Sequence, residues 1–331
     1  MATAASSHDH PARKAYIITG PTSGIGRATV FEIVKQGAVI LVGRDREKLT
    51  RLQQALQRDG GLAVSVLCDL SDMASVRRAA AEIVGLGHPI AGLLNNAGML
   101  ETQPTKNAAG WDMTFATNHL GPFALTEALA PHLPDGARVL FVASTVEDPD
   151  ANPGKAVGYR GGRYISAEAS ARGAWQPGGS KVPGADAYAT SKQCNLAAAM
   201  VFARETPRLR FNAVTPGLIP TTGLFGGDAN SIGSLLSKYV TAALLPLCMP
   251  FMTFLSTPKH AARVITKILT DTSGQTGIYY DERGRPMLGS ARVREPNFQD
   301  RVVAETRALL GVAARNDSRP DAQSSRNSDA R

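Results

Sequence analysis

The stretch AYIITGPTSGIGR, residues 15–27, decides the fold of this chain of 331 residues. It starts with an apolar run that predicts a buried strand, and a helical pattern follows from about residue 26. The glycines between them permit a tight turn and the close approach of another molecule to the backbone. A helix N-terminus at such a turn presents free N–H groups to a phosphate. We therefore predict a dinucleotide site with these candidate contacts: Thr19, Gly20, Ser23, Gly24, Ile25 and Gly26. The alternative is that the glycines serve only the turn.

Short apolar runs alternate with helical patterns along most of the chain. Strands are predicted at 15–19, 38–42, 63–67, 90–94, 138–143, 210–214 and 275–280, and helices at 26–36, 46–58, 73–84, near 110–133 and from about 186. Such alternation predicts parallel strands, right-handed crossovers and helices on both faces of the sheet. We expect a doubly wound, Rossmann-like α/β sheet in one domain over 14–312, preceded by a flexible lead (1–13) and followed by a disordered tail (313–331).

Two long segments interrupt this alternation, and both are expected to be functional loops. Residues 146–185 form an insert rich in Gly, Pro and Arg. Residues 218–258 contain an apolar run that is predicted to form a lid over a bulky apolar substrate. A dimer contact, ordinary core and weak contact with a membrane surface remain open as alternatives for this run. Pro246 and Pro250 interrupt it, so a transmembrane helix is not expected.

The amino-acid composition indicates the compartment of the protein and the kinds of partner it binds. The chain is 43% apolar, and this apolar content excludes disorder as its main state. Its net charge is +8. Its cysteines, at 68, 194 and 248, lack the spacing of a disulfide framework or a zinc cluster, so we expect no metal and a reducing, intracellular setting. The N-terminus shows no apolar leader, so we expect a cytoplasmic protein. The basic residues are scattered without an aromatic platform, so no nucleic-acid partner is expected.

Further motifs follow the glycine turn, whose spacing T-G-x-x-x-G-x-G resembles that of the short-chain dehydrogenase/reductase family. In order they are Asp69, Asn95-Asn96-Ala97-Gly98, Asn118, Ser144, Tyr188-x-x-x-Lys192, Pro216-Gly217 and Thr221. The resemblance spans about residues 14 to 312 and implies a contact of Asp69 with adenine, of Asn95 with the adenosine side and of Thr221 with the nicotinamide carboxamide. Alternatively, Asp69 caps the helix that begins near residue 71, and Asn95 only ties strands together.

The type of cofactor is indicated by the end of the second strand. This strand ends in Gly43-Arg44, and Arg27 follows the glycine turn. Two guanidinium groups at this place suit a 2′-phosphate, because Arg binds phosphate in a bidentate way. We therefore predict NADP(H). Asp45 is a nearby competitor for the ribose, and the alternative for Arg44 is a solvated residue at a helix start.

The predicted chemical centre is the pair Tyr188 and Lys192, which share one face of a helix. An ammonium group beside a phenol favours the phenolate and lowers the phenol's pKa, so the pair can move a proton while hydride is transferred. The resemblance implies that both also bind the cofactor, that Ser144 donates a hydrogen bond to the substrate oxygen and that Asn118 links Lys192 to a water chain. Thr145 is the alternative to Ser144. His119 is expected to be a packed or solvated helix residue rather than a catalytic one, and Cys194 a small buried side chain rather than a nucleophile.

The substrate side resembles the branch that contains retinol dehydrogenases and light-dependent protochlorophyllide reductases. This resemblance rests on the long insert and on the stretches YATSKQCN (188–195) and PGLIPTTGLF (216–225). The protochlorophyllide reductase pattern has cysteine where this chain has Leu218, and alanine where it has Gly98. We expect an NADP(H)-dependent oxidoreductase that acts on a carbonyl or alcohol of a bulky apolar molecule. The alternatives are reduction of a ring C=C bond and a catalytically silent redox sensor or scaffold that binds the dinucleotide. The resemblance to the family also implies that a homo-oligomer is possible.

Overall fold

The computed structural model describes residues 13–150, 154–155, 158–219 and 256–313. Within them, the strands form one sheet in the order β3-β2-β1-β4-β5-β6-β7-β8. Neighbouring strands pair in parallel, except that β7 and β8 are antiparallel. The strands are β1 (Ala15–Thr19), β2 (Ala38–Gly43), β3 (Ala63–Leu67), β4 (Ile90–Asn95), β5 (Arg138–Val142), β6 (Arg210–Val214), β7 (Ile278–Tyr280) and β8 (Pro286–Met287). This confirms the predicted doubly wound, Rossmann-like α/β fold.

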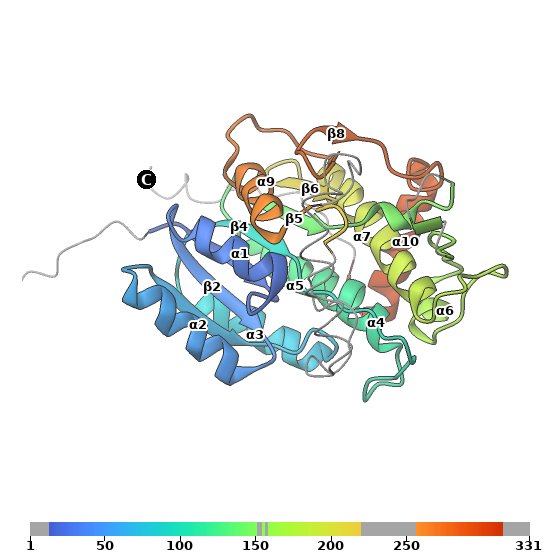
Figure 1. Cartoon of the computed structure of the whole chain (residues 1–331), viewed down its shortest axis with the longest axis horizontal. Helices are drawn as coiled ribbons and strands as arrows, with labels where there is room; N and C mark the ends of the chain where they lie inside the picture. The colour runs from blue at the N-terminus through green and yellow to red at the C-terminus, as the bar shows by residue number, and fades with distance from the viewer. Residues whose placement is uncertain (1–12, 151–153, 156–157, 220–255, 314–331) are drawn as a thin grey trace, which may run out of the picture.

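Helices cover both faces of the sheet (Figure 1). One face carries α1 (Gly24–Ile33), α2 (Arg46–Arg58) and α9 (Pro258–Thr270), of which α1 and α9 lie side by side. The other face carries α3 (Met73–Gly85), α5 (Gly121–Leu129), α7 (Ala185–Glu205) and α10 (Pro296–Leu310). The central strands are therefore buried on both faces. This burial explains why their sequences are continuous apolar runs rather than alternating patterns.

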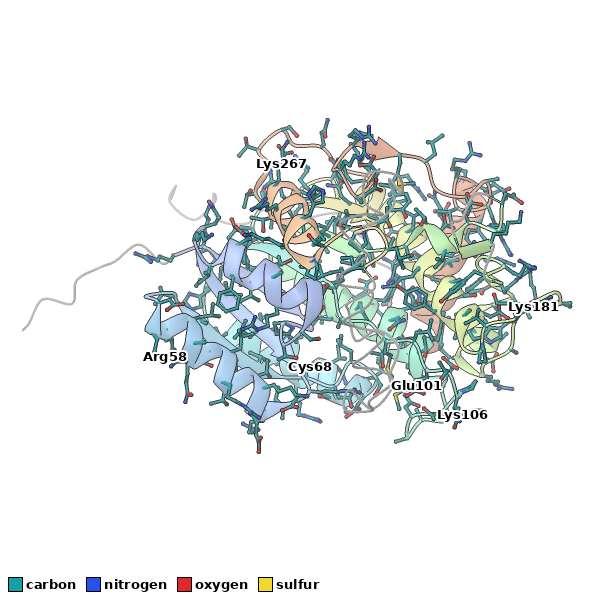
Figure 2. All side chains as sticks on the ribbon, viewed as in Figure 1. Arg58, Cys68, Glu101, Lys106, Lys181 and Lys267 are labelled. Carbon is teal, nitrogen blue, oxygen red and sulfur yellow. The ribbon has the colours of Figure 1, made fainter. Side chains whose placement is uncertain are left out.

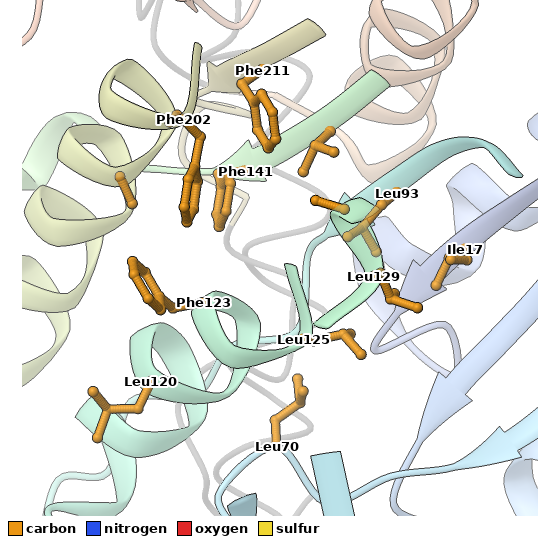
Figure 3. Close-up of a cluster of buried hydrophobic side chains, with 14 of the residues drawn as sticks. Ile17, Leu70, Leu93, Leu120, Phe123, Leu125, Leu129, Phe141, Phe202 and Phe211 are labelled. Carbon is orange, nitrogen blue, oxygen red and sulfur yellow. The ribbon is translucent and has the colours of Figure 1, made fainter. Parts of the chain in front are cut away.

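Aromatic rings of the larger core join α5 and α7 to the middle of the sheet (Figure 3). The ring centroids of Phe123 and Phe202 lie 5.2 Å apart, and those of Phe202 and Phe211 lie 5.3 Å apart. Each such pair contributes on the order of 1 kcal/mol beyond the burial of its area. This packing fixes α7, the helix that carries Tyr188 and Lys192, against strand β6.

The helix expected near 110–133 is broken into several parts, so that prediction is wrong as a single helix. The structure has α4 (Met113–Phe115), a π-helical segment (Ala116–Leu120), α5 and a 3₁₀ turn (Ala130–His132). Pro122 has no N–H to donate to the carbonyl of Asn118, and the side chain of Asn195 donates to that carbonyl instead, at 2.8 Å. The break thus lies at Asn118, one of the predicted site residues.

The insert at 146–185 is attached to the body of the domain. It begins with a 3₁₀ turn (Thr145–Glu147) and contains α6 (Ala167–Ala171). The hydroxyl of Tyr164 donates to Glu305 of α10 at 2.7 Å, and the N–H of Ala167 donates to the same carboxylate at 3.0 Å. The part of the insert around Tyr164 and α6 therefore packs against α10, on the same side of the sheet as α7.

The end of the sheet differs from the prediction. The strand expected at 275–280 is shorter, Ile278–Tyr280, and a turn at residues 281–285 leads into β8. The two-residue strand β8 was missed because one of its residues is proline, which is uncommon in strands.

Several predicted segments lie outside the described residues. They are 1–12, 220–255 and 314–331, which hold the lead, most of the predicted lid at 218–258, the tail and Thr221. The domain bounds 14–312, the lid and the tail therefore stay predictions. Among the residues that the structure describes, no helix is long and apolar enough to cross a membrane.

Candidate active site

The glycine turn after β1 is held by a network around Thr19. Its hydroxyl donates to the carbonyl of Leu94 at 3.1 Å and accepts from the N–H groups of Asn96 and Ala97 at 2.9 and 3.0 Å. The side chain of Asn96 in turn donates to the carbonyls of Thr19 and Gly20 at 2.9 and 3.3 Å. The turn therefore keeps one conformation. Asn96, rather than Asn95, therefore ties the ends of β1 and β4 together, and the sequence does not distinguish the two because they stand side by side in the motif.

Two positions in the turn favour glycine over any larger residue. A Cβ on Gly26 would lie 2.1 Å from the carbonyl oxygen of Gly20, so no larger residue fits without displacement of the backbone. Gly20 itself has a φ of +65°, which favours glycine. Ser23 is the N-cap of α1 but makes no side-chain cap bond, so the first N–H groups of this helix are left for a ligand. The turn thus has the form of a phosphate cradle.

The side chains at the end of β2 and at the start of α1 are basic and exposed. Arg44 follows β2 directly, and Arg27 lies on the first turn of α1. Asp45, the competitor for the ribose, is the N-cap of α2 and accepts from the N–H of Lys48 at 3.0 Å. Lys48 also forms an ion pair with this carboxylate at 3.0 Å, and these hydrogen bonds lower the pKa of Asp45. The carboxylate of Asp45 is therefore already engaged by its own helix.

Asp69 follows β3 and shapes the next turn. Its carboxylate accepts from the N–H and the hydroxyl of Ser71 at 2.9 and 2.7 Å. The cap of α3 is Asp72 rather than Asp69, so the capping alternative for Asp69 is wrong. Asn95 is buried at the end of β4, and its side chain donates to the hydroxyl of Thr126 at 2.9 Å.

Helix α7 brings Tyr188 and Lys192 into the interior, beside the end of β5. Both side chains are buried, and the ammonium nitrogen of Lys192 lies 5.5 Å from the centre of the Tyr188 ring. The same nitrogen donates to the carbonyl of Val142 at 2.9 Å. Ser144 lies two residues beyond the end of β5, and its side chain interacts with that of Tyr188. The structure therefore brings these three predicted residues together.

Asn118 lies next to this group, at the π-helical break. Its side chain exchanges two hydrogen bonds of 2.8 Å with the backbone of Met99 and donates to the hydroxyl of Ser191 at 3.3 Å. A Cβ on Gly98 would lie 3.5 Å from both the Asn118 oxygen and the Lys192 nitrogen. Asn118 and Lys192 therefore face the same point at the end of β4.

Burial sets the charge states of the central pair. It raises the pKa of Tyr188, and the hydrogen bond with Ser144 offsets only part of this effect. Burial lowers the pKa of Lys192 to about 8. The pKa of Tyr188 is thus raised and not lowered as expected from Lys192. A bound anion or an oxygen-rich ligand at this place would stabilise the charged form of Lys192 and thereby raise the pKa of Lys192.

His119 and Cys194 are packed side chains, as predicted. The two ring nitrogens of His119 lie 3.0 Å from the Asn195 oxygen and 3.1 Å from the Thr306 hydroxyl, and burial lowers the pKa of His119 to about 4. Cys194 is fully buried, and burial raises its pKa. Neither side chain is available for acid–base or nucleophilic chemistry at neutral pH.

Comparison with known proteins agrees with this geometry. The sequence model of the family described as short chain dehydrogenase matches residues 14–155. Protochlorophyllide reductase from Avena sativa is 30% identical over 325 residues, which cover 90% of this chain and 99% of that protein. The chain belongs to the short-chain dehydrogenase/reductase family. As a member, it is an oxidoreductase with a nucleotide-binding Rossmann fold.

Two further similarities extend the comparison. Retinol dehydrogenase 14 from Mus musculus is 37% identical over 147 residues, which cover 40% of this chain and 44% of that protein. A short chain dehydrogenase from Burkholderia cenocepacia, solved in complex with NADP, is 18% identical with a TM-score of 0.59 and covers 82% of this chain and 96% of that one. The second likeness shows the fold alone.

Proposed function

We propose that the protein is an NADP(H)-dependent oxidoreductase that transfers hydride between the nicotinamide and a carbonyl or alcohol of a bulky apolar substrate. The observation that carries this proposal is the meeting of Ser144, Tyr188 and Lys192 at the carboxyl end of β5, with Asn118 beside them. This edge is where open α/β sheets bind their ligands. A silent redox sensor would not need a buried lysine and tyrosine, which are costly to maintain.

The cofactor fits the residues that are present, because the glycine turn leaves no room for side chains and the first turn of α1 has free N–H groups. The residues proposed to hold it are Thr19, Gly20, Ser23, Gly24, Ile25, Gly26, Arg44, Asp69, Asn95, Tyr188, Lys192 and Thr221. When bound, NADPH supplies the hydride. Arg44 and Arg27 support NADP(H) over NAD(H), since a 2′-phosphate would meet two guanidinium groups while Asp45 is engaged by Lys48.

The chain's own residues handle the proton and the orientation. Tyr188 donates its hydroxyl proton to the carbonyl oxygen as that oxygen gains negative charge, and a proton taken up from solvent restores the Tyr188 hydroxyl before the next turnover. Ser144, whose side chain interacts with that of Tyr188, donates its hydroxyl proton in a hydrogen bond to the same carbonyl oxygen and fixes the carbonyl. Lys192 stabilises the tyrosinate that forms, and Asn118 holds the backbone at Met99 beside them.

The substrate class is supported by the surroundings of Tyr188. Its ring packs in a cluster with Leu100, Tyr159 and Ala185, and with the partly buried Val146 and Val182. An apolar wall beside the reacting group favours an apolar substrate. The test is the oxidation of NADPH with a panel of bulky ketones, aldehydes and quinones. Turnover that is lost in Tyr188→Phe supports the proposal, and undiminished turnover in that variant refutes it.

Reduction of a ring C=C bond is the second candidate, and the similarity to protochlorophyllide reductase over 90% of the chain favours it. Leu218 speaks against it, because a leucine cannot provide the thiol of the pattern at that position; the Leu218 side chain is 51% exposed. The two candidates are separated by assays with protochlorophyllide in light and in darkness. Turnover of the pigment alone, and only in light, would favour the second candidate over the first.

A further inference from the structure

Tyr159 lies beside the proposed proton donor although no motif of the sequence includes it. It belongs to the insert, and only 9% of its surface is exposed. Its ring is part of the same apolar cluster as Tyr188, together with Leu100 and Ala185. The insert therefore places a second phenol next to the reacting position.

The ring of Tyr159 is fixed, but its hydroxyl has no partner. Its N–H donates to the carbonyl of Gly154 at 3.0 Å, and its own carbonyl accepts from the guanidinium of Arg160 at 3.1 Å. Within the described residues, the hydroxyl of Tyr159 makes no hydrogen bond, and it is not one of the fully enclosed polar atoms. By contrast, the hydroxyls of Tyr164 and Tyr280 donate to Glu305 and Gln275. Because this hydroxyl is not enclosed and has no partner among the described residues, it is accessible to a molecule in the site.

The side chains of Tyr159 and Tyr188 belong to one packed cluster, which places the two phenols near each other. A negative charge on Tyr159 raises the pKa of Tyr188, and burial raises the pKa of Tyr159 itself. Tyr159 is therefore a neutral O–H group at physiological pH. A neutral hydroxyl both donates and accepts hydrogen bonds, so it suits an oxygen of a substrate.

We propose that the Tyr159 hydroxyl binds a second oxygen of the substrate, adjacent to the carbonyl that Tyr188 protonates. The substrate class is then ketones with a neighbouring oxygen: vicinal diones, ortho-quinones and α-hydroxy ketones. This inference rests on the proposed function. It follows from position, because Ser144 and Tyr188 hold the reacting oxygen while Tyr159 is a neighbouring polar group on a wall that is otherwise apolar. A site built to bind a substrate oxygen discriminates against analogues that lack it.

The test compares phenanthrenequinone, which has two adjacent carbonyls, with fluorenone, which has one. The measured quantity is kcat/KM for phenanthrenequinone divided by kcat/KM for fluorenone, with NADPH, in the wild type and in Tyr159→Phe. We expect this ratio to fall roughly three- to tenfold in Tyr159→Phe, mainly through KM for the quinone, because one hydrogen bond is lost. Tyr280→Phe is the matched control, since it removes a hydroxyl bound to Gln275, and its ratio should equal that of the wild type.

A binding experiment provides the same comparison without turnover. The dissociation constants of both compounds are measured by fluorescence titration of the protein with NADP⁺, and only quinone binding should weaken in Tyr159→Phe. An unchanged kinetic ratio and unchanged quinone binding would overturn the role of Tyr159. The proposed function fails separately, if Tyr188→Phe still reduces either ketone at the rate of the wild type.

Discussion

Lys192 should destabilise the protein in the absence of cofactor, because its ammonium group is buried and pairs with no carboxylate in the part of the chain that the structure describes. Among the described residues its hydrogen-bond partner is the carbonyl of Val142. Replacement of Lys192 by Met keeps most of the side-chain volume and removes the charge. We therefore expect Lys192→Met to increase the free energy of unfolding while it abolishes turnover.

The magnitude follows from the pKa. Burial lowers the pKa of Lys192 from 10.5 to about 8, and each unit corresponds to about 1.4 kcal/mol, so the charged form costs on the order of 3 kcal/mol at neutral pH. Loss of the hydrogen bond to Val142 costs the variant about 1 kcal/mol. The expected net gain of Lys192→Met is about 2 kcal/mol near pH 7.

The sign of the pH dependence is opposite to that of a paired lysine. Between pH 8 and 10.5 the native state binds fewer protons at Lys192 than the unfolded state does, so the stability of the wild type rises with pH in this window. The advantage of Lys192→Met should therefore shrink by about 2 kcal/mol between about pH 7 and about pH 9.5.

The assay is urea unfolding of the cofactor-free protein at these two pH values. Lys267→Met is the control, because Lys267 is exposed on α9 and lies at the periphery of the molecule (Figure 2); its difference from the wild type should be near zero at both pH values. A Lys192→Met variant that is less stable than the wild type at pH 7, or an advantage that does not change with pH, would refute the reasoning.

Four other substitutions test the cofactor cradle and the core. Arg44→Ala should weaken NADPH far more than NADH, and equal losses of affinity would remove the argument for the 2′-phosphate. Gly26→Ala should abolish cofactor binding because its Cβ has no space, whereas Gly98→Ala, whose Cβ makes contacts of 3.5 Å, should keep activity within a few-fold; the opposite order would contradict the geometry of both glycines. Arg307→Met should lower the unfolding free energy by about 3 kcal/mol, since it leaves the buried Glu127 without its 2.7 Å ion pair. A loss below about 1 kcal/mol would show that this ion pair stabilises little.

Strands β1 to β7 and the helices up to α7 could largely be predicted because their signals are local, whereas α9, β8 and α10 were not predicted. Strand β1 and the glycine turn occupy adjacent positions in the sequence, and the glycines are required by contacts within the same turn. Helix α2 begins where expected because Asp45 caps it and three leucines at helical spacing face the core. The pair Tyr188 and Lys192 was predictable for the same reason, since their spacing places them on one helix face.

The remaining features depend on contacts between distant parts of the chain. The π-helical break at Asn118 requires the side chain of Asn195, 77 positions away, to replace the N–H that Pro122 lacks. The distinction between Asn95 and Asn96 depends on which one faces the glycine turn. Tyr159 stands in an insert without periodicity, so only the folded chain shows its position beside Tyr188.

The central claim is that Tyr188 transfers the proton that accompanies hydride transfer. The most direct test is the kcat of Tyr188→Phe with NADPH and the best bulky ketone, together with the dissociation constant of NADPH. We predict that kcat falls by at least about 10²-fold, the usual contribution of general acid catalysis, while NADPH binding changes little. A kcat within a few-fold of the wild type, with NADPH still bound, would contradict the account.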